Sequence, residues 1–368
     1  MRVSAALPLG VSALLFDSAR RRRRLEGVLA ERLCSAGFEE VILPILDYFE
    51  PYEPLLTPAG RGELYRFVDR DGELLALRAD STPMLARLLA PRIATLPLPL
   101  RLFYRGDVVR YQEERAGLQR EFYEMGAELV GLPGEQAEHD MLLLFLELLA
   151  LAETEPPPQD QAPAIAGASN EIPAPAGALN ETQVVLGFAG ALDVLLLAAG
   201  GDDPSRLAAA VARRERGEVR RTAPRLPALL EIVEHGVPER PGDLGESAAE
   251  RLRGLLALAA ELAARFPRVE LTIDLAEFAR QSLDPRLARL GEASGERPYY
   301  DGLVFRAYRG AAALPVGGGG RYDRLFRSLG ADVPAVGFSL GLDRLLQVGA
   351  RGTIQEGGAA RPLPGGSP

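Results

Sequence analysis

The sequence predicts an α+β protein in which a helical insertion divides one sheet-based domain. Strand signals occupy two separate parts of the chain, residues 101–130 and residues 269–308. Between them, residues 183–266 are rich in Leu, Ala and Arg, with apolar residues at helical spacing. Strands followed by helices and then by strands again are typical of a single interrupted domain rather than of alternating βαβ units.

The first part of the predicted core covers residues 1–154. Residues 18–36 predict a helix, because their apolar side chains recur at helical spacing and Gly37 follows as a stop. The dipeptide Asp71-Gly72 lies between two short apolar runs and predicts a hairpin. The same periodicities predict a strand over 38–46 that Pro44 interrupts, hairpin strands over 65–68 and 74–77, a helix over 85–90, strands over 101–111 and 119–130, and a helix over 135–152.

Composition divides the rest of the chain. Residues 155–182 are dominated by Pro, Ala and polar residues, which bury too little apolar surface to offset chain entropy, so we expect a disordered linker. Residues 183–266 are then the helical insertion, and residues 267–347 the second part of the core. Residues 348–368, rich in Gly and Pro, predict a disordered tail.

The charge balance opposes nonspecific binding of nucleic acid. The formal net charge is −9, and five consecutive arginines at positions 20–24 make the only dense basic cluster, which we expect to be the solvated first turn of a helix. We therefore expect no nucleic-acid partner. The sequence lacks an apolar run of about 18 residues and a convincing signal-peptide cleavage site, so we expect no membrane span and no secretion. Cys34 is the single cysteine, which excludes an intrachain disulfide and favours a cytoplasmic location.

Charged side chains and glycines share one face of two adjacent strands. On the second long strand, Glu124, Gly126 and Glu128 point to the same side, and a glycine between two carboxylates leaves room for a ligand. On the preceding strand, Gly106 and Arg110 share a face. Arg110 suits a carboxylate or phosphate, and the two glutamates suit an ammonium or imidazole N–H. A solvated sheet face with ordinary ion pairs is the competing interpretation of this spacing.

Four segments together resemble histidyl-tRNA synthetases, which are class II synthetases. Leu77-Arg-Ala-Asp-Ser-Thr-Pro83 is similar to the family segment that contacts histidine, and residues 104–131 resemble the second class II motif. Arg297-Pro-Tyr-Tyr-Asp-Gly-Leu-Val-Phe305 is similar to the histidine-specific tyrosine segment, and residues 317–345 resemble the third motif. The segments follow the family's order. The resemblance implies an antiparallel class II sheet flanked by helices, with a helical insertion.

The resemblance also implies two sets of site residues. The positions that match the family's histidine-binding residues are Asp80, Thr82, Arg110, Glu124, Glu128, Tyr299 and Tyr300. The positions that match its ATP site are Gln112, Arg321 and Arg344, and we expect that ATP site to be vestigial.

Three departures argue against aminoacyl-tRNA synthesis. Gln112 replaces a glutamate that contacts adenine in the family. Gly295 occupies the position of the family's catalytic arginine, and Arg280 or Arg297 would have to substitute for it. Removing a group that stabilises developing charge in the transition state typically costs orders of magnitude in rate. The segment after residue 347 does not resemble the family's anticodon-binding domain.

This combination resembles the synthetase paralogue that serves as the regulatory subunit of ATP phosphoribosyltransferase. The resemblance implies no catalytic residues, no cofactor and no metal. It implies a synthetase-like dimer of the chain with itself and L-histidine as effector. It also implies assembly with the short-form catalytic subunit, for the first step of histidine biosynthesis and its feedback inhibition. The alternatives are an adenylate-forming amino-acid ligase without a tRNA-binding domain and a truncated histidyl-tRNA synthetase.

Three other features indicate structure rather than chemistry. His139 and His235 are isolated from cysteines, so they do not predict a zinc site. The four glycines at 317–320 lack the Lys-Ser/Thr ending of a phosphate-binding loop, and we expect a glycine-rich strand beneath a ligand. Ser339 fits Gly-x-Ser-x-Gly but lacks the strand-turn-helix context of a hydrolase nucleophile.

Overall fold

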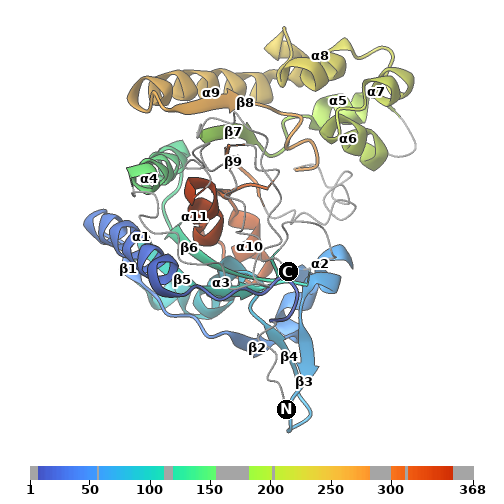
Figure 1. Cartoon of the computed structure of the whole chain (residues 1–368). Coiled ribbons are helices and arrows are strands. Elements are labelled where there is room, and N and C mark those ends of the chain that lie inside the picture. The colour runs from blue at the N-terminus through green and yellow to red at the C-terminus, as the bar shows by residue number, and fades with distance from the viewer. Residues whose placement is uncertain are drawn as a thin grey trace, which may run out of the picture.

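A mixed eight-stranded sheet forms the centre of the chain (Figure 1). The computed structural model describes residues 7–55, 58–111, 119–154, 182–200, 204–281, 300–310 and 314–350. The spatial order of the strands is β1 (Glu39–Glu40), β5 (Leu100–Val109), β6 (Glu121–Val130), β11 (Ala335–Gly341), β10 (Gly317–Arg321), β9 (Leu303–Arg309), β7 (Thr182–Phe188) and β8 (Val269–Ile273).

Most neighbouring strands in this sheet are antiparallel. Only the outer pairs, β1 with β5 and β7 with β8, run parallel. The central pairs β5–β6, β6–β11, β11–β10 and β10–β9 are all antiparallel. The predicted α+β class is therefore confirmed.

One face of the sheet is covered by helices α1 (Phe16–Ser35) and α4 (Glu135–Thr154). Phe145 of α4 packs against Phe305 and Phe338, with ring centroids 4.9 and 5.3 Å apart. Leu29 and Leu33 of α1 are fully buried in the same core. The helix predicted over 18–36 is thus confirmed, and it ends before Gly37, whose φ of +80° suits glycine.

A small second sheet contains the predicted hairpin. Its strand order is β2 (Leu46–Tyr48), β4 (Leu74–Leu77) and β3 (Arg66–Val68), and Gly72 adopts a φ of +90° in the turn between β3 and β4. The strand predicted over 38–46 is interrupted around Pro44, as expected, but it is shorter than predicted, and β1 and β2 on either side of the break belong to different sheets. Arg78 explains the break, because its Nη1 donates to the carbonyls of Leu43 (2.7 Å) and Pro44 (3.1 Å), which then do not join a ladder.

The range predicted as a helical insertion begins with a strand. Residues 183–188 belong to β7, inside the main sheet, and Val184 and Leu186 are fully buried in the core. The β-branched pair Val184-Val185 favours a strand, and tertiary pairing with β9 and β8 completes it. The helices that follow are α5 (Asp193–Ala198), α6 (Pro204–Ala212), α7 (Arg216–Thr222), α8 (Pro227–His235) and α9 (Glu246–Arg265). In Figure 1, α5 to α8 gather at one end of the molecule and α9 runs alongside β8.

The remaining helices are α2 (Pro58–Glu63), α3 (Ser81–Leu89), α10 (Asp323–Ser328) and α11 (Leu342–Ala350), with 3₁₀ turns over Glu50–Leu55, Ala90–Thr95 and Pro241–Leu244. Helix α3 starts four residues before the predicted residue 85, because Asp80 caps its N-terminus. Helix α11 continues through residues 348–350, into the range predicted as the tail. The rest of that tail and residues 155–181 of the predicted linker lie outside the described residues. None of the described helices is both long enough and apolar enough to span a membrane.

The arginine run at positions 20–24 is not simply a solvated turn. The Arg22 guanidinium lies 4.5 Å from the ring centroid of Tyr123 in β6 and 3.6 Å from the Asp343 carboxylate in α11. Arg21 donates to the carbonyl of Leu346 in α11. This part of the basic cluster therefore fastens α1 to the core.

Candidate functional site

Glycines line the sheet face opposite α4. Gly337 pairs with Glu128 on one side and with Gly320 on the other, so the three residues lie in one row across β6, β11 and β10. A β-carbon on Gly337 would stand 1.5 Å from Oε2 of Glu128, and one on Gly320 would stand 2.9 Å from the Tyr300 ring. Only glycine lets these side chains lie flat against the sheet. The predicted glycine-rich strand is confirmed as β10.

Glu128 is fully buried on this face and accepts three hydrogen bonds. Its Oε1 accepts from the hydroxyls of Thr82 at 2.7 Å and Tyr104 at 3.3 Å, and its Oε2 accepts from the hydroxyl of Tyr322. Burial raises the pKa of Glu128 to about 8, although the hydroxyls of Tyr322 and Thr82 act in the opposite direction. The carboxyl group is therefore held in place, and no Lys or Arg of the described residues forms an ion pair with it.

Glu124 lies four residues before Glu128, on the same face of β6. Its Oε1 accepts from the hydroxyl of Ser81 at 2.7 Å and from the backbone N–H of Ser81 at 3.3 Å. Burial raises the pKa of Glu124, the nearby carboxylate of Asp80 raises it further, and Arg110 lowers it.

The start of α3 brings three polar side chains to these glutamates. Asp80 accepts from the Thr82 backbone N–H at 2.9 Å, which fixes the first turn of the helix. That turn directs Ser81 to Glu124 and Thr82 to Glu128. The structure thus brings together four of the predicted histidine-binding residues, namely Asp80, Thr82, Glu124 and Glu128.

Arg110 is the fifth predicted residue at this place. Its Nε donates to the carbonyl of Ala79 at 2.6 Å, and its Nη2 lies 3.7 Å from Oδ2 of Asp80. Arg344 approaches the same region, because both guanidinium groups lie 5.4 Å from the ring centroid of Phe122. Burial, and then the neighbouring Arg110, lower the pKa of Arg344.

Two tyrosines lie at the other end of the row. Tyr300 is half-buried against Gly320, and Tyr322 is buried with its hydroxyl on Glu128. Tyr299 lies outside the described residues, as do Gln112, Gly295 and Arg297. Arg280 is described, and its Nε is buried without a hydrogen-bond partner.

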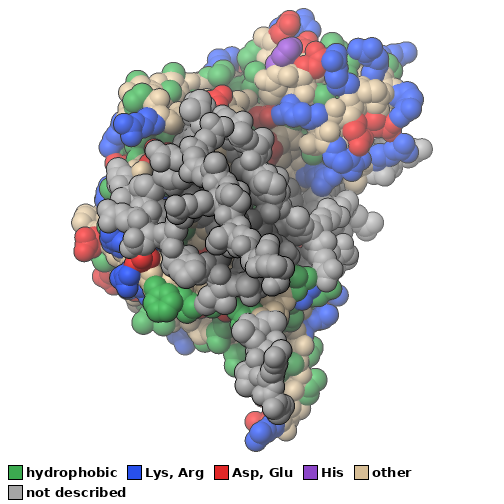
Figure 2. Space-filling view, viewed as in Figure 1, with side chains coloured by type: hydrophobic (Ala, Val, Ile, Leu, Met, Phe, Trp, Pro, Cys, Tyr) green, Lys and Arg blue, Asp and Glu red, His purple; other side chains and the backbone are tan. Residues whose placement is uncertain are grey.

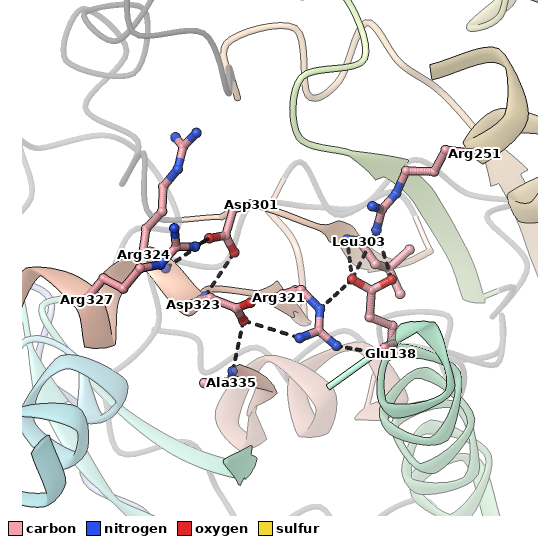
Figure 3. Close-up of polar contacts among 10 residues, drawn as sticks. Glu138, Arg251, Asp301, Leu303, Arg321, Asp323, Arg324, Arg327 and Ala335 are labelled. Carbon is pink, nitrogen blue, oxygen red and sulfur yellow. Dashed lines mark hydrogen bonds and ion pairs between the residues drawn. The ribbon is translucent and has the colours of Figure 1, made fainter. Parts of the chain in front are cut away.

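Arg321 is not part of this site, contrary to its predicted place beside Arg344. Successive side chains of a strand point to opposite faces of the sheet. Gly320 lies on the same face as Glu128, and Arg321 lies on the face that α4 covers. The Arg321 guanidinium donates to Glu138 at 2.8 Å and to the carbonyl of Gly134 at 2.6 Å (Figure 3). Its donors are therefore occupied within the fold.

Three residues of the site were absent from the predicted set. Ser81 lies between two predicted residues, Asp80 and Thr82, so its position in the sequence could have indicated a place in the site. Tyr104 shares a strand face with Gly106, and Tyr322 belongs to the quoted third-motif segment. Their hydrogen bonds depend on pairings between distant strands, which spacing does not reveal. Ser339 lies in the interior of β11, not at a turn, and the described residues contain no group of three or more His, Cys, Asp or Glu placed to bind a metal ion.

The arrangement suits a ligand with positive charge and N–H donors. Within the described residues, three carboxyl groups lie on this face, those of Asp80, Glu124 and Glu128. Arg110 is the cation that contacts one of them, Asp80. Burial disfavours the charged form of Glu124 and Glu128, and a cationic ligand group beside them would favour that form. The aromatic rings of Tyr300 and Phe122 supply apolar walls at either end.

Comparison with known proteins identifies the family. The chain matches the histidyl-tRNA synthetase family over residues 10–158 and 170–345. It is 35% identical over 369 residues to the ATP phosphoribosyltransferase regulatory subunit of Moorella thermoacetica, covering 92% of this chain and 81% of that one. It is 31% identical over 372 residues to the corresponding subunit of Anaeromyxobacter dehalogenans, covering 98% and 99%. The chain belongs to the family of ATP phosphoribosyltransferase regulatory subunits.

Solved structures show that this regulatory-subunit family member has the class II synthetase fold. A protein of Bacillus halodurans, described as an ATP phosphoribosyltransferase regulatory subunit/histidyl-tRNA synthetase, superposes with a TM-score of 0.71 at 21% identity, covering 95% of this chain and 84% of that one. The Staphylococcus aureus histidyl-tRNA synthetase gives a TM-score of 0.56 at 17% identity, with coverages of 94% and 73%. A chain of the Thermotoga maritima ATP phosphoribosyl transferase (HisG:HisZ) complex gives 0.59 at 20% identity, with coverages of 87% and 97%. The fold implied by the four sequence segments is confirmed.

Proposed function

We propose that this regulatory-subunit family member binds L-histidine on the glycine-lined face and transmits feedback inhibition to a short-form ATP phosphoribosyltransferase catalytic subunit. In this role it has no catalysis of its own. The protein acts in the first step of histidine biosynthesis, and the catalytic subunit provides the chemistry.

One observation carries the proposal. Glu124 and Glu128 are buried four residues apart on one strand face, burial raises the pKa of each, and Gly337 and Gly320 let Glu128 and Tyr300 lie close to the sheet. Histidine offers an α-ammonium group and an imidazole N–H, and each can donate a charge-assisted hydrogen bond to a glutamate. Arg110 is available for the ligand carboxylate, and Tyr300 for the ring.

The proposed absence of catalysis rests on the ATP side of the site. Gln112 and Gly295 replace two residues that the synthetase family uses for ATP. Arg321 adds no compensation, because its guanidinium is bonded to Glu138 and Gly134. The alternative, an adenylate-forming ligase, is favoured only by the two arginines Arg110 and Arg344 around Phe122.

A dimer of the chain with itself is also part of the proposal. The small sheet and the loop before it expose large apolar side chains, of which Ile42 is 89% and Val68 65% exposed. Exposed apolar surface of this kind marks interaction sites in soluble proteins. The catalytic-subunit partner is inferred from family membership and from the Thermotoga maritima complex.

Titration calorimetry with L-histidine tests the binding claim. Micromolar affinity corresponds to about −8 kcal/mol, which charge-assisted hydrogen bonds to the two glutamates and burial of the ring can supply. We expect saturable binding without ATP or tRNA. Absence of saturation up to millimolar histidine would contradict the proposal, and histidine-dependent ATP–pyrophosphate exchange by the chain alone would favour the ligase instead.

A further inference from the structure

A buried carboxylate behind the sheet joins three separate segments of the chain. Glu138, on the first turn of α4, accepts from Arg321 Nε at 2.8 Å and from the Leu303 backbone N–H at 3.1 Å. It also accepts from Arg251 Nη2 through both of its oxygens, at 3.0 and 2.9 Å. Figure 3 shows the Glu138 side chain between the two arginines. One carboxylate thus links the end of β10, the start of β9 and helix α9.

The first link leads to Tyr322. Arg321 is pinned by Glu138 on one side of the strand, and the next residue, Tyr322, points to the ligand side and donates to Glu128. Asp323 then accepts from Arg321 Nη1 at 3.3 Å and from the Ala335 backbone N–H at 2.9 Å. Tyr322 therefore sits between two anchored neighbours, and its hydroxyl can be placed on Glu128 only while they stay anchored.

The second link leads to Tyr300. The Asp301 carboxylate accepts from the backbone N–H groups of Asp323 and Arg324, both at 2.9 Å, and from Arg327 Nη2 at 2.7 Å. Two residues farther on, the Leu303 N–H reaches Glu138. The segment that carries Tyr300 over Gly320 is thus fixed to the same set of charges (Figure 3).

The third contact of Glu138 connects the core to the helical insertion. Arg251 belongs to α9, in the helical insertion, and its guanidinium lies 5.6 Å from the ring centroid of Phe188 at the end of β7. Its side chain is 31% exposed, whereas that of Glu138 is 5% exposed. Arg251 is therefore the more exposed partner of a buried carboxylate, and a displacement of α9 acts directly on Glu138.

We propose that Glu138 and Arg251 are positioning residues for the ligand site, through which the helical insertion controls the placement of Tyr300 and Tyr322. The inference rests on the proposed histidine site, because Tyr322 acts there through its hydrogen bond to Glu128. A partner that moves the insertion, or histidine that moves the two tyrosines, acts on the same cluster, and such coupling is reciprocal in binding free energy.

Helix α9 offers a matched control for this role. Arg265 also joins α9 to α4, with its Nη2 2.7 Å from Oε1 of Glu147. Within the described part of the chain, the ion-pair partners of Glu147 are Arg265 and Arg32 of α1, and neither belongs to the tyrosine segments. Arg265→Met therefore removes a similar connection between the same helices without touching the cluster. Arg251→Met keeps the apolar stem beside Phe188 and removes only the donor.

The test compares full-length wild type, Arg251→Met, Arg251→Lys and Arg265→Met by histidine calorimetry and by hydrogen exchange without ligand. We expect Arg251→Met to weaken histidine binding about tenfold, equivalent to about 1.4 kcal/mol. We expect Arg265→Met to stay within about twofold and Arg251→Lys to restore part of the loss. Exchange should quicken in peptides covering 300–303 and 320–324 in Arg251→Met but not in Arg265→Met.

Wild-type affinity in Arg251→Met, with or without faster exchange, would overturn the positioning role. Equal effects of the Arg251→Met and Arg265→Met substitutions would do the same, because they would indicate general loosening of α9. Failure of the proposed function looks different, since wild type itself would then show no saturable histidine binding. Hydrogen exchange would still report on the link from Arg251 to the tyrosine segments in that case.

Discussion

The carboxylate of Glu128 lies directly over Gly337, where a β-carbon would stand 1.5 Å from Oε2. The close approach follows from strand register, because the two residues are paired partners on β6 and β11. The buried acid therefore keeps its position only while residue 337 has no side chain.

Gly337→Ala should displace Glu128 and weaken histidine binding at least about 30-fold, which corresponds to about 2 kcal/mol. Overpacking should also cost about 1–3 kcal/mol of unfolding free energy. Calorimetry and urea unfolding measure the two effects. Gly254→Ala is the control, since Gly254 lies in α9 with open space around its β-position and should gain up to about 1 kcal/mol of stability. Unchanged histidine affinity in Gly337→Ala would place the ligand elsewhere.

Glu128→Gln keeps the shape of the side chain and removes its charge. We expect histidine binding to weaken by about 2–5 kcal/mol, because one partner of a desolvated charge pair is lost. Glu121→Gln is the control, since Glu121 begins the same strand with an exposed side chain. Both variants are compared with wild type by calorimetry. Equal affinity of the two variants would remove Glu128 from the site.

Stability should depend on pH through Glu128. Its pKa is about 8 in the folded protein and about 4.3 in an unfolded chain, so the folded state binds more protons between these values. The unfolding free energy therefore falls as pH rises through this window, by up to about 1.4 kcal/mol per pH unit, and levels off above about pH 8. The raised pKa of Glu124 acts in the same direction.

Urea unfolding of wild type and Glu128→Gln from pH 5 to 9 measures this effect. The variant should gain stability relative to wild type as pH rises, because it has no charge to bury. A difference between the two proteins that stays constant over this range would show that Glu128 is not the titrating group.

The arginine run on α1 allows a separate test of stability. Arg22 lies beside Tyr123 and Asp343 with its side chain 22% exposed, whereas Arg20 is 67% exposed and pairs with Asp17 in the same helix. Arg22→Met should cost about 1–2 kcal/mol, from a partly desolvated cation–π contact and ion pair. Arg20→Met should cost less than about 0.5 kcal/mol, as exposed pairs do. A larger loss of unfolding free energy in Arg20→Met than in Arg22→Met, measured by denaturant unfolding, would contradict this assignment.

The sequence alone could predict that Glu124 and Glu128 share a sheet face, because strand alternation is a local property. Glu124, Gly126 and Glu128 share a face whatever lies next to them. The contact of Glu128 with Gly337 depends on the register of two strands far apart in the chain, so spacing could not predict it. The assignment of Arg321 to the ATP site failed for a related reason. The sheet face on which its side chain lies depends on the pairing of β10 with β11.

Two errors in the predicted elements have physical causes of the same kind. β7 lies next to a stretch rich in Leu and Ala, and its pairing with β8 and β9 outweighs that local composition. The strand predicted over 38–46, with its interruption at Pro44, is shorter than predicted, and the Arg78 guanidinium binds the carbonyls of Leu43 and Pro44 between its two parts. In both cases a tertiary partner decides the local structure.

The most direct measurement is the activity of a short-form ATP phosphoribosyltransferase catalytic subunit from the same organism, mixed with this chain and titrated with L-histidine. We predict that activity requires the chain and falls as histidine is added, while the chain alone shows neither phosphoribosyl transfer nor ATP–pyrophosphate exchange. Activity of the partner that is the same with and without the chain, or that does not respond to histidine, would contradict the account.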